Sequence, residues 1–273
     1  MIELRACQGH DEMEACVRLQ IEVWGYDPSD VIPRKAFLVA QVIGGQAIGA
    51  FDTELSSNGP EAMVGFALSL PGVKTGNFEP RAYLHSHMLA VREAYRNRGL
   101  GAHLKQEQRR EALARGIRHM EWTFDPLQIK NAHLNIHRLG AIACRYLVDF
   151  YGVSSSRLQG GLPTDRLVAE WRLDSPRVQA ILEGGPASNY VIEEQILVPA
   201  SIYQWKASEA DWDRALDVQL ENRRKFQQAF SQGLAVLGFV RDAEGNGIFE
   251  LGPLTHLDLD ELQTKSPNES PRL

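Results

Sequence analysis

Apolar and polar positions follow two alternating periods along the first two thirds of the chain. A period of two is typical of strands, and it occurs in stretches at residues 2–6, 46–51, 63–70, 83–91, 118–124, 141–151 and 166–173. Helical spacing, with suitable start and stop residues, predicts helices at 11–24, 33–43, 100–116 and 131–139. Strands that interleave with helices in this way predict an α/β fold, a mixed central β-sheet flanked by helices.

The pattern changes after Asp174. Gly and Pro interrupt residues 175–186, which predicts a short helix and a linker. A strand follows at 190–199, and two further strands at 234–240 and 247–251 flank a turn, which predicts a hairpin.

The longest helical pattern in the chain covers residues 208–231, and Ser208 with Asp211 resembles a capping box. The predicted buried stripe of this helix consists of Trp212, Leu216, Leu220, Arg223, Phe226 and Phe230. Such a stripe must be covered, and the central sheet, the hairpin at 234–251 or a second copy of the chain in a homodimer could each cover it.

The sequence therefore predicts a domain at 1–173 and a C-terminal αβ extension at 174–255. The polar tail, 256–273, is predicted to be flexible.

Composition and charge narrow the classes of function. The chain has 273 residues, of which 44% are hydrophobic, and three cysteines without metal-like spacing. The odd number of cysteines argues against a disulfide framework and for a reducing, cytoplasmic location. No signal peptide or membrane span is visible, so no membrane partner is expected. A net charge of −6 without a long basic block argues against nucleic acid as a partner.

One short stretch concentrates glycine and arginine. Residues 91–101 read V-R-E-A-Y-R-N-R-G-L-G, directly after an apolar strand and before a helix. Gly99 and Gly101 allow a tight turn and close approach of a ligand, while the free N–H groups of the first helical turn attract anions. Arg96 and Arg98 add donors for phosphate oxygens. Residues 92–102 therefore form a predicted pyrophosphate cradle.

The residues of this stretch distinguish between the known phosphate-binding motifs. The dinucleotide fingerprint needs a third glycine where Leu104 stands, which makes a dinucleotide-binding enzyme a distant alternative, and the Walker motif is absent. The stretch M-L-A-V-R-E-A-Y-R-N-R-G-L-G-A-H-L resembles the acetyl-CoA-binding motif of the GNAT acyltransferase superfamily, [QR]-x-x-G-x-[GA]. The order of elements and the break at Leu139-Gly140-Ala141 are also similar, and the resemblance covers roughly residues 1–173.

The resemblance implies a GNAT-like fold and an N-acyltransferase that uses acetyl-CoA, or another acyl-CoA, as co-substrate. Main-chain groups of Leu89 and Val91 would pair with the pantetheine arm. The pyrophosphate would be held by Arg96, Asn97, Arg98, Gly99, Leu100, Gly101 and Ala102. Asn131 or Asn135 would contact the co-substrate from the next helix, although Asn131 could equally serve only as a helix N-cap.

Acyl transfer from a thioester to an amine needs a base and help for the leaving thiolate. His85 lies eleven residues before the motif, where related enzymes have a carboxylate base, and His87 follows on the same strand face. Packing roles for both histidines are an equal alternative, and Glu93 is a weaker candidate base.

The usual tyrosine acid is missing from residues 134–137, so Tyr146 on the next strand, His137 or a water would replace it. That departure leaves a second hypothesis open, a non-catalytic protein that binds or senses acyl-CoA. The acceptor itself, a small-molecule or peptide amine, is not specified by the sequence.

Two histidines at helical spacing, His133 and His137, could seat a metal. No third ligand accompanies them, so a solvent-facing pair is favoured and no metal is expected.

Overall fold

The computed structural model describes residues 1–56, 59–75, 80–185 and 190–254, so the predicted flexible tail lies outside the described residues. The chain folds as two compact units. The first consists of Met1–Val73, Ala82–Trp122 and Ser154–Leu158. The second consists of Lys74–Arg81, Thr123–Val153 and the chain from Gln159 onward.

The first unit is built on strands in the order β1-β2-β3-β4-β5. Their bounds are β1 (Ile2–Ala6), β2 (Gln46–Asp52), β3 (Met63–Lys74), β4 (Arg81–Val91) and β5 (His119–Phe124). Pairing is antiparallel from β1 to β3 and parallel between β4 and β5. The helical segments are α1 (Gly9–Trp24), α2 (Arg34–Val42), η1 (Pro60–Ala62), η2 (Glu93–Tyr95) and α3 (Leu100–Ala114).

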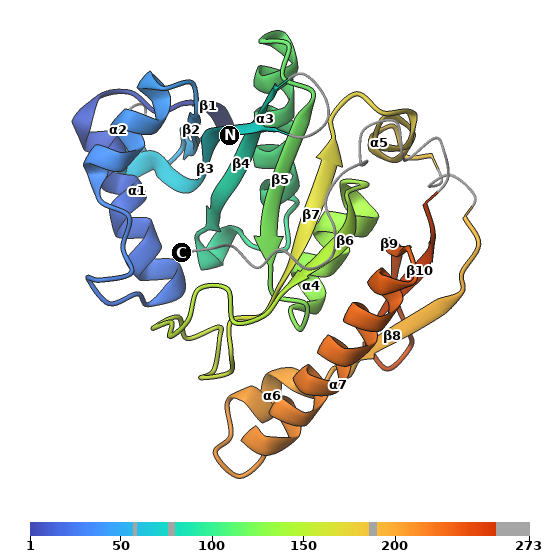
Figure 1. Ribbon diagram of the computed structural model, residues 1–273. Coiled ribbons are helices and arrows are strands. Elements are labelled where there is room, and N and C mark those ends of the chain that lie inside the picture. Colours follow the sequence, from blue (N-terminus) through green and yellow to red (C-terminus); the bar gives the residue numbers. More distant parts are fainter. Residues whose placement is uncertain (57–58, 76–79, 186–189, 255–273) are drawn as a thin grey trace. The chain divides into compact units, whose positions relative to one another are not determined.

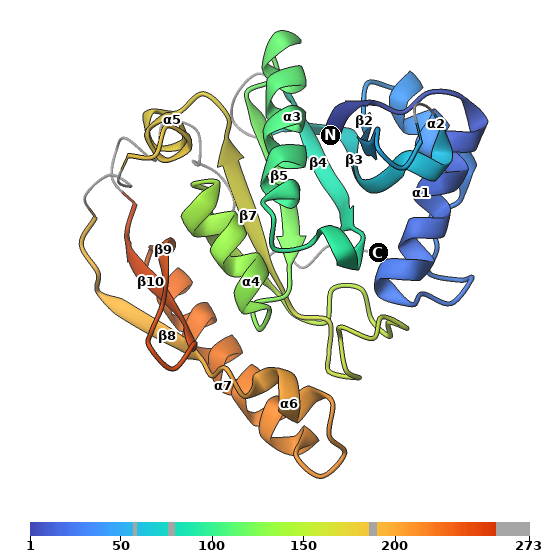
Figure 2. The ribbon, with the colours of Figure 1, turned by 180° about the vertical axis from the view of Figure 1, so that it is seen from behind.

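Helices cover both faces of this sheet (Figures 1 and 2). On one face, α1 and α2 contribute Met13, Leu19 and Phe37 to a cluster with Phe66 of β3. On the other face, α3 packs Leu100 and Leu104 against β2 and β3 in a separate cluster. Apolar side chains on both faces explain why β2 is buried along its whole length.

The second unit contains strands in the order β7-β6-β9-β10-β8, which pair antiparallel. Their bounds are β6 (Ile142–Leu147), β7 (Arg166–Arg172), β8 (Glu194–Val198), β9 (Leu234–Arg241) and β10 (Gly247–Pro253). The helical segments are α4 (Ile129–Ala132), η3 (His133–Arg138), α5 (Pro176–Leu182), α6 (Ile202–Lys206) and α7 (Trp212–Ser231).

The predicted fold class is confirmed: the structure is α/β with a mixed sheet, flanking helices and additional C-terminal αβ elements. The domain boundary after residue 173 stays a prediction. The compact units have a different boundary, because residues 159–173 belong to the same unit as the chain that follows them.

The strand predicted at 141–151 is shorter than its alternation suggests. Strand β6 ends at Leu147, and Asp149 adopts a left-handed φ of 45° that a strand cannot contain. Val148 and Phe150 are consequently exposed, although the alternation over 141–151 puts them on one strand face with Ile142. Hydrogen bonds from Thr164 to the Asp149 carboxylate hold this turn.

Two details of the long C-terminal helix also differ from the prediction. Helix α7 begins at Trp212 after a separate α6, and Asp211 caps it without a side-chain hydrogen bond, so no capping box forms. The buried face is rotated from the predicted stripe, because Leu220 is 43% exposed. The fully buried positions are Ala215, Gln219, Asn222, Phe226 and Ala229. Polar Gln219 and Asn222 are buried because they donate to main-chain carbonyls.

Candidate functional site

The glycine-rich loop joins β4 to α3 through two left-handed residues. Asn97 has φ 61°, and Gly99 has φ 82° at the N-cap of α3. A Cβ at Gly99 would come no closer than 3.8 Å to its nearest neighbour, the His103 ring. The space beside Gly99 is therefore open, and it is the backbone conformation that requires glycine there.

Main-chain donors face the open side of this turn. Helix α3 has 15 residues, and the N–H groups of its first turn, those of Leu100, Gly101 and Ala102, have no partner within the helix. His103 is the first to bond back, to the Gly99 carbonyl at 3.1 Å. Together with the helix dipole, these N–H groups form an anion-binding site.

The two predicted arginines stand at the same place. Arg96 and Arg98 are both exposed, and Arg96 Nε donates to the Val91 carbonyl at 3.1 Å, which directs its side chain toward the end of β4. Arg98 lies near the Tyr95 ring, 5.7 Å from its centroid. Among the described residues, no carboxylate pairs with either guanidinium. Both charges are therefore available to an anionic ligand, and the residues present fit a pyrophosphate.

Contacts outside the loop hold its shape. The Tyr95 hydroxyl donates to the Asp52 carboxylate at 2.7 Å, and this bond raises the pKa of Tyr95. Arg92 Nε donates to Glu22 at 3.0 Å. A cavity of about 380 Å³ lies beside the loop, lined by Met1, Ile2, Asp52, Tyr95, Arg98, Leu100 and His103. The loop is thus fixed before any ligand binds, which lowers the entropy cost of binding.

Strands β4 and β5 pair over a short distance and then part. Their parallel register joins Leu84 to Met120 and His85 to Glu121. Strand β4 continues for six residues beyond that point, to Val91. The part of β4 that does not pair with β5, which includes the predicted Leu89 and Val91, therefore lies where the fork opens.

Strand β4 contains one extra residue near the point where it separates from β5. Ser86 donates to Gln108, so its side chain faces α3, and Leu89 also packs in the cluster formed by α3. Residues three apart in a regular strand would face opposite sides, so the strand must contain a bulge, and we place it at His87–Met88. Met88 packs on the other face, against α1 and α2. A bulge frees main-chain groups and bends the strand.

The predicted histidines lie on this forked part of the sheet. The rings of His85 and His87 are 6.1 Å apart, and His85 Nδ1 lies 3.8 Å from a carboxylate oxygen of Glu121. Burial, with a smaller contribution from the charge of His85, lowers the pKa of His87, so His87 is neutral at neutral pH and can accept a proton.

Glu121 was not predicted from the sequence. It is buried, with 8% of its surface exposed, between the buried residues Met120 and Trp122. A charged residue inside an otherwise apolar strand was the available signal, but only the strand register places it opposite His85.

The remaining predicted residues belong to the second unit. Asn131 is exposed on α4 and Asn135 is 4% exposed on η3. The alternative role of Asn131 as an N-cap is wrong, because α4 begins at Ile129 and its cap is Gln128. Helix α4 continues as the π-helical η3 and ends before Gly140, which has φ 75°.

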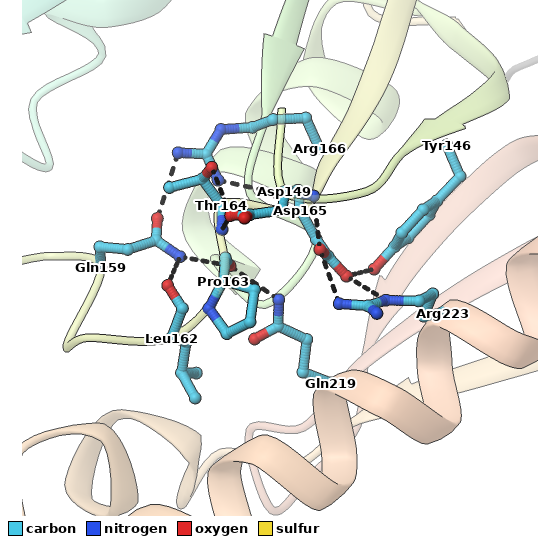
Figure 3. Close-up of polar contacts among 10 residues, drawn as sticks. All are labelled: Tyr146, Asp149, Gln159, Leu162, Pro163, Thr164, Asp165, Arg166, Gln219 and Arg223. Atoms are coloured by element: carbon cyan, nitrogen blue, oxygen red, sulfur yellow. Dashed lines mark hydrogen bonds and ion pairs between the residues drawn. The ribbon is translucent and has the colours of Figure 1, made fainter. Parts of the chain in front are cut away.

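Tyr146 is held in a buried polar network (Figure 3). Its hydroxyl donates to the Asp165 carboxylate at 2.6 Å, and that carboxylate also accepts two hydrogen bonds from Arg223. Burial, with the charge of Asp165, raises the pKa of Tyr146 well above its usual range. The tyrosine proton is thus committed to a carboxylate, an arrangement that opposes proton donation to a leaving group.

The predicted histidine pair on η3 has stacked rings, with centroids 4.5 Å apart. His137 is exposed, whereas His133 is half-buried and burial lowers its pKa. The pair is therefore only partly solvent-facing.

These features define an α/β protein with a glycine turn and free main-chain N–H groups at the mouth of a forked parallel strand pair. Residues 35–140 match the acetyltransferase (GNAT) family, so the chain carries a GNAT acetyltransferase family domain. Among curated proteins, no sequence matches this one.

Two solved structures of one plant protein share the fold. Arabidopsis thaliana NAA60 in complex with acetyl-CoA matches with a TM-score of 0.51 and 15% identity, covering 63% of this chain and 99% of that one. NAA60 with a bisubstrate analogue matches with a TM-score of 0.50 and 16% identity, covering 63% and 98%. At these identities the likeness concerns the fold. Among the described residues, no helix is long and apolar enough to cross a membrane.

Proposed function

We propose that this protein transfers an acetyl group from acetyl-CoA to the amine of a small molecule or peptide. The observation that carries the proposal is the turn at Gly99: main-chain donors, Arg96 and Arg98 converge on open space at the mouth of the β4–β5 fork. A fixed anion site of this kind suits the pyrophosphate of acetyl-CoA. The family match supports the same conclusion.

Binding is divided between the cradle and the strand. The main-chain groups of residues 96–102 and the two arginines hold the pyrophosphate. The main chain of Leu89 and Val91 in β4, which does not pair with β5, holds the pantetheine amides. Asn131 and Asn135 stay candidate contacts for the co-substrate, as the resemblance to the family implies. When bound, acetyl-CoA supplies an activated acyl thioester.

The chain's own residues supply proton transfer. An amine attacks a thioester only after it loses its proton, and His87, kept neutral by burial, is the first candidate to accept it. His85 is the second candidate, and Glu121 at 3.8 Å can orient its ring. The main-chain N–H groups freed by the bulge at His87–Met88 can donate to a developing negative charge on the acyl oxygen.

The alternative is a protein that binds acetyl-CoA without turnover. It is favoured by one observation, the commitment of the Tyr146 proton to Asp165. A free thiol is an acceptable leaving group near neutral pH, so the missing acid does not by itself exclude catalysis.

Calorimetric titration of acetyl-CoA into the wild type, Arg96→Gln and Gly99→Ala tests the cradle. We expect each variant to weaken binding by about 1.5–3 kcal/mol, or about 10- to 150-fold, since Arg96→Gln removes a charge-assisted phosphate contact and Gly99→Ala strains a positive φ. Arg110→Gln is the matched control, because Arg110 is exposed on the same helix and pairs with Glu107. Unchanged affinity in both folded cradle variants would refute the assignment. Thiol release from acetyl-CoA over a panel of amines then separates an enzyme from a pure binding protein.

A further inference from the structure

Lys105 of α3 lies where strands β4 and β5 part. Its Nζ donates to the Ser86 hydroxyl of β4 at 2.7 Å and stands 3.5 Å from the centroid of the Trp122 ring of β5. Ser86 and Trp122 each directly follow the last paired residues of their strands, His85 and Glu121. One side chain therefore contacts both strands at the base of the fork.

The lysine belongs to a polar chain buried between α3 and the sheet. The Ser86 hydroxyl in turn donates a hydrogen bond to the Gln108 side chain at 3.0 Å. The main-chain oxygen of Gln108 accepts from Gln46, whose own side-chain oxygen accepts from Ser69. Lys105 is 3% exposed, and Gln108, Ser69 and Gln46 are equally buried. Polar groups at such positions cost stability in a protein core, so a purely apolar contact would stabilise this interface better.

Two effects oppose each other in setting the charge of Lys105. The face of Trp122, 3.5 Å from Nζ, favours the ammonium form. Among the residues that the structure describes, no carboxylate pairs with Lys105, and burial disfavours the ammonium form by more, since buried lysines show the largest downward shifts. Burial therefore lowers the pKa of Lys105 well below 10.5. A neutral amine can hold Ser86 without a nearby counter-ion.

We propose that Lys105 is a positioning residue: by bridging Ser86 and Trp122 it sets the opening of the β4–β5 fork and the bulge at His87–Met88, where the acyl end of acetyl-CoA is used. The inference rests on the proposed function. Lys105 acts through the strands and not on the pyrophosphate. It stands six residues beyond Gly99, about 9 Å along the helix axis.

This separation predicts a particular kinetic signature. A displaced fork misplaces the reacting end, and a misplacement of about 1 Å can cost about 100-fold in rate. The cradle at the helix N-terminus is untouched. Lys105→Met, which keeps an unbranched chain over Trp122 but cannot bond Ser86, should lower kcat by about 10- to 100-fold. The affinity for CoA and the KM for acetyl-CoA should stay within about threefold.

Steady-state thiol release and CoA calorimetry on five proteins test the proposal: wild type, Lys105→Met, Lys105→Gln, Ser86→Ala and the control Gln106→Met. Gln106 is exposed on the same helix, so its variant should behave as wild type. Ser86→Ala should reproduce the kcat loss, because it breaks the same bond from the other side. Lys105→Gln, whose amide can still donate to Ser86, should recover part of the loss.

Full kcat in both Lys105→Met and Ser86→Ala, even with altered stability, would reduce the lysine to a structural role and overturn the proposal. A wild type that binds CoA but shows no turnover would instead refute the proposed transferase. In that case amide hydrogen exchange over 86–91 still decides the positioning role, since Lys105→Met must change the exchange rates there and Gln106→Met must not. Unchanged exchange over 86–91 in Lys105→Met would overturn it.

Discussion

Replacement of Asp165 by Asn is expected to destabilise the second unit strongly, because Asp165 is the centre of the network in Figure 3. The carboxylate is 1% exposed and accepts four hydrogen bonds. The donors are the Tyr146 hydroxyl at 2.6 Å, the Asp149 main chain at 3.0 Å, and Arg223 Nε and Nη2 at 2.8 and 2.9 Å. These contacts join β6, the loop before β7 and helix α7.

The magnitude follows from what the asparagine leaves behind. Its amide has one acceptor oxygen in place of two, so Arg223 loses both its counter-ion and at least one hydrogen bond. Breaking a buried ion pair on one side costs about 3–5 kcal/mol, since the remaining charge stays uncompensated. Arg223 retains 21% exposure, and water can solvate part of its charge. We therefore expect a loss near the lower end, about 3 kcal/mol.

Urea denaturation followed by circular dichroism measures the change. Arg224→Met on the same helix is the control, because Arg224 is exposed and pairs only with surface partners, so its loss should be within about 1 kcal/mol. The double variant Asp165→Asn with Arg223→Met should recover part of the stability, since it removes the orphaned charge. A loss below about 1 kcal/mol for Asp165→Asn would refute the reasoning that this network holds α7 to the sheet.

Other predictions concern titration and truncation. If His87 is the base, the acidic limb of the kcat/KM pH profile lies below pH 6.5, because the pKa of His87 is lowered. The variant His87→Gln should then lose most turnover. Wild-type rates and an unchanged acidic limb in that variant would assign the role of base to His85. Lys105→Met should be more stable than the wild type near neutral pH. The folded-state pKa of Lys105 is lowered, so the unfolded chain binds a proton that the folded chain lacks, and wild-type stability rises with pH up to about 10.5. Denaturation at neutral and alkaline pH should therefore show the advantage of the variant shrinking as pH increases, and a constant advantage would contradict this. Ending the chain at Leu173 should give insoluble or partly unfolded protein, because β6 loses its partner β9 and the stacked Phe226 leaves Tyr146; a cooperatively folding fragment with full acetyl-CoA affinity, judged by calorimetry, would contradict it.

The cradle was predictable from the sequence because its causes are local. A glycine between a strand and a helix, followed by helix-forming residues, is sufficient to place free N–H groups at the turn. The structure finds α3 starting at Leu100 and Gly99 at φ 82°, within the predicted loop. The positions of Arg96 and Arg98 were predictable for the same reason, since a few covalent bonds fix their backbone beside the turn.

The candidate catalytic residues were only partly predictable. His85 and His87 were found by their spacing from the motif, but the partner of His85, Glu121, lies on another strand. The general acid was not found, and Tyr146 proves to be bonded to Asp165, nineteen residues later in the chain.

The sequence by itself determined the elements whose signals are short-range: the strand periods, the glycine turns and helices such as α1 and α3. The tertiary structure alone decided which polar side chains are buried and what they face. Nothing in the sequence of helix α3 marks Lys105 as buried. Its Nζ nevertheless contacts Ser86 and Trp122 at the base of the fork. Leu220, which belongs to the predicted buried stripe of its helix, is exposed, while Gln219 beside it is buried. The physical reason is the same in each case: burial depends on the register of strands that are distant in sequence, and a periodicity of 3.6 or 2 residues carries no information about that register.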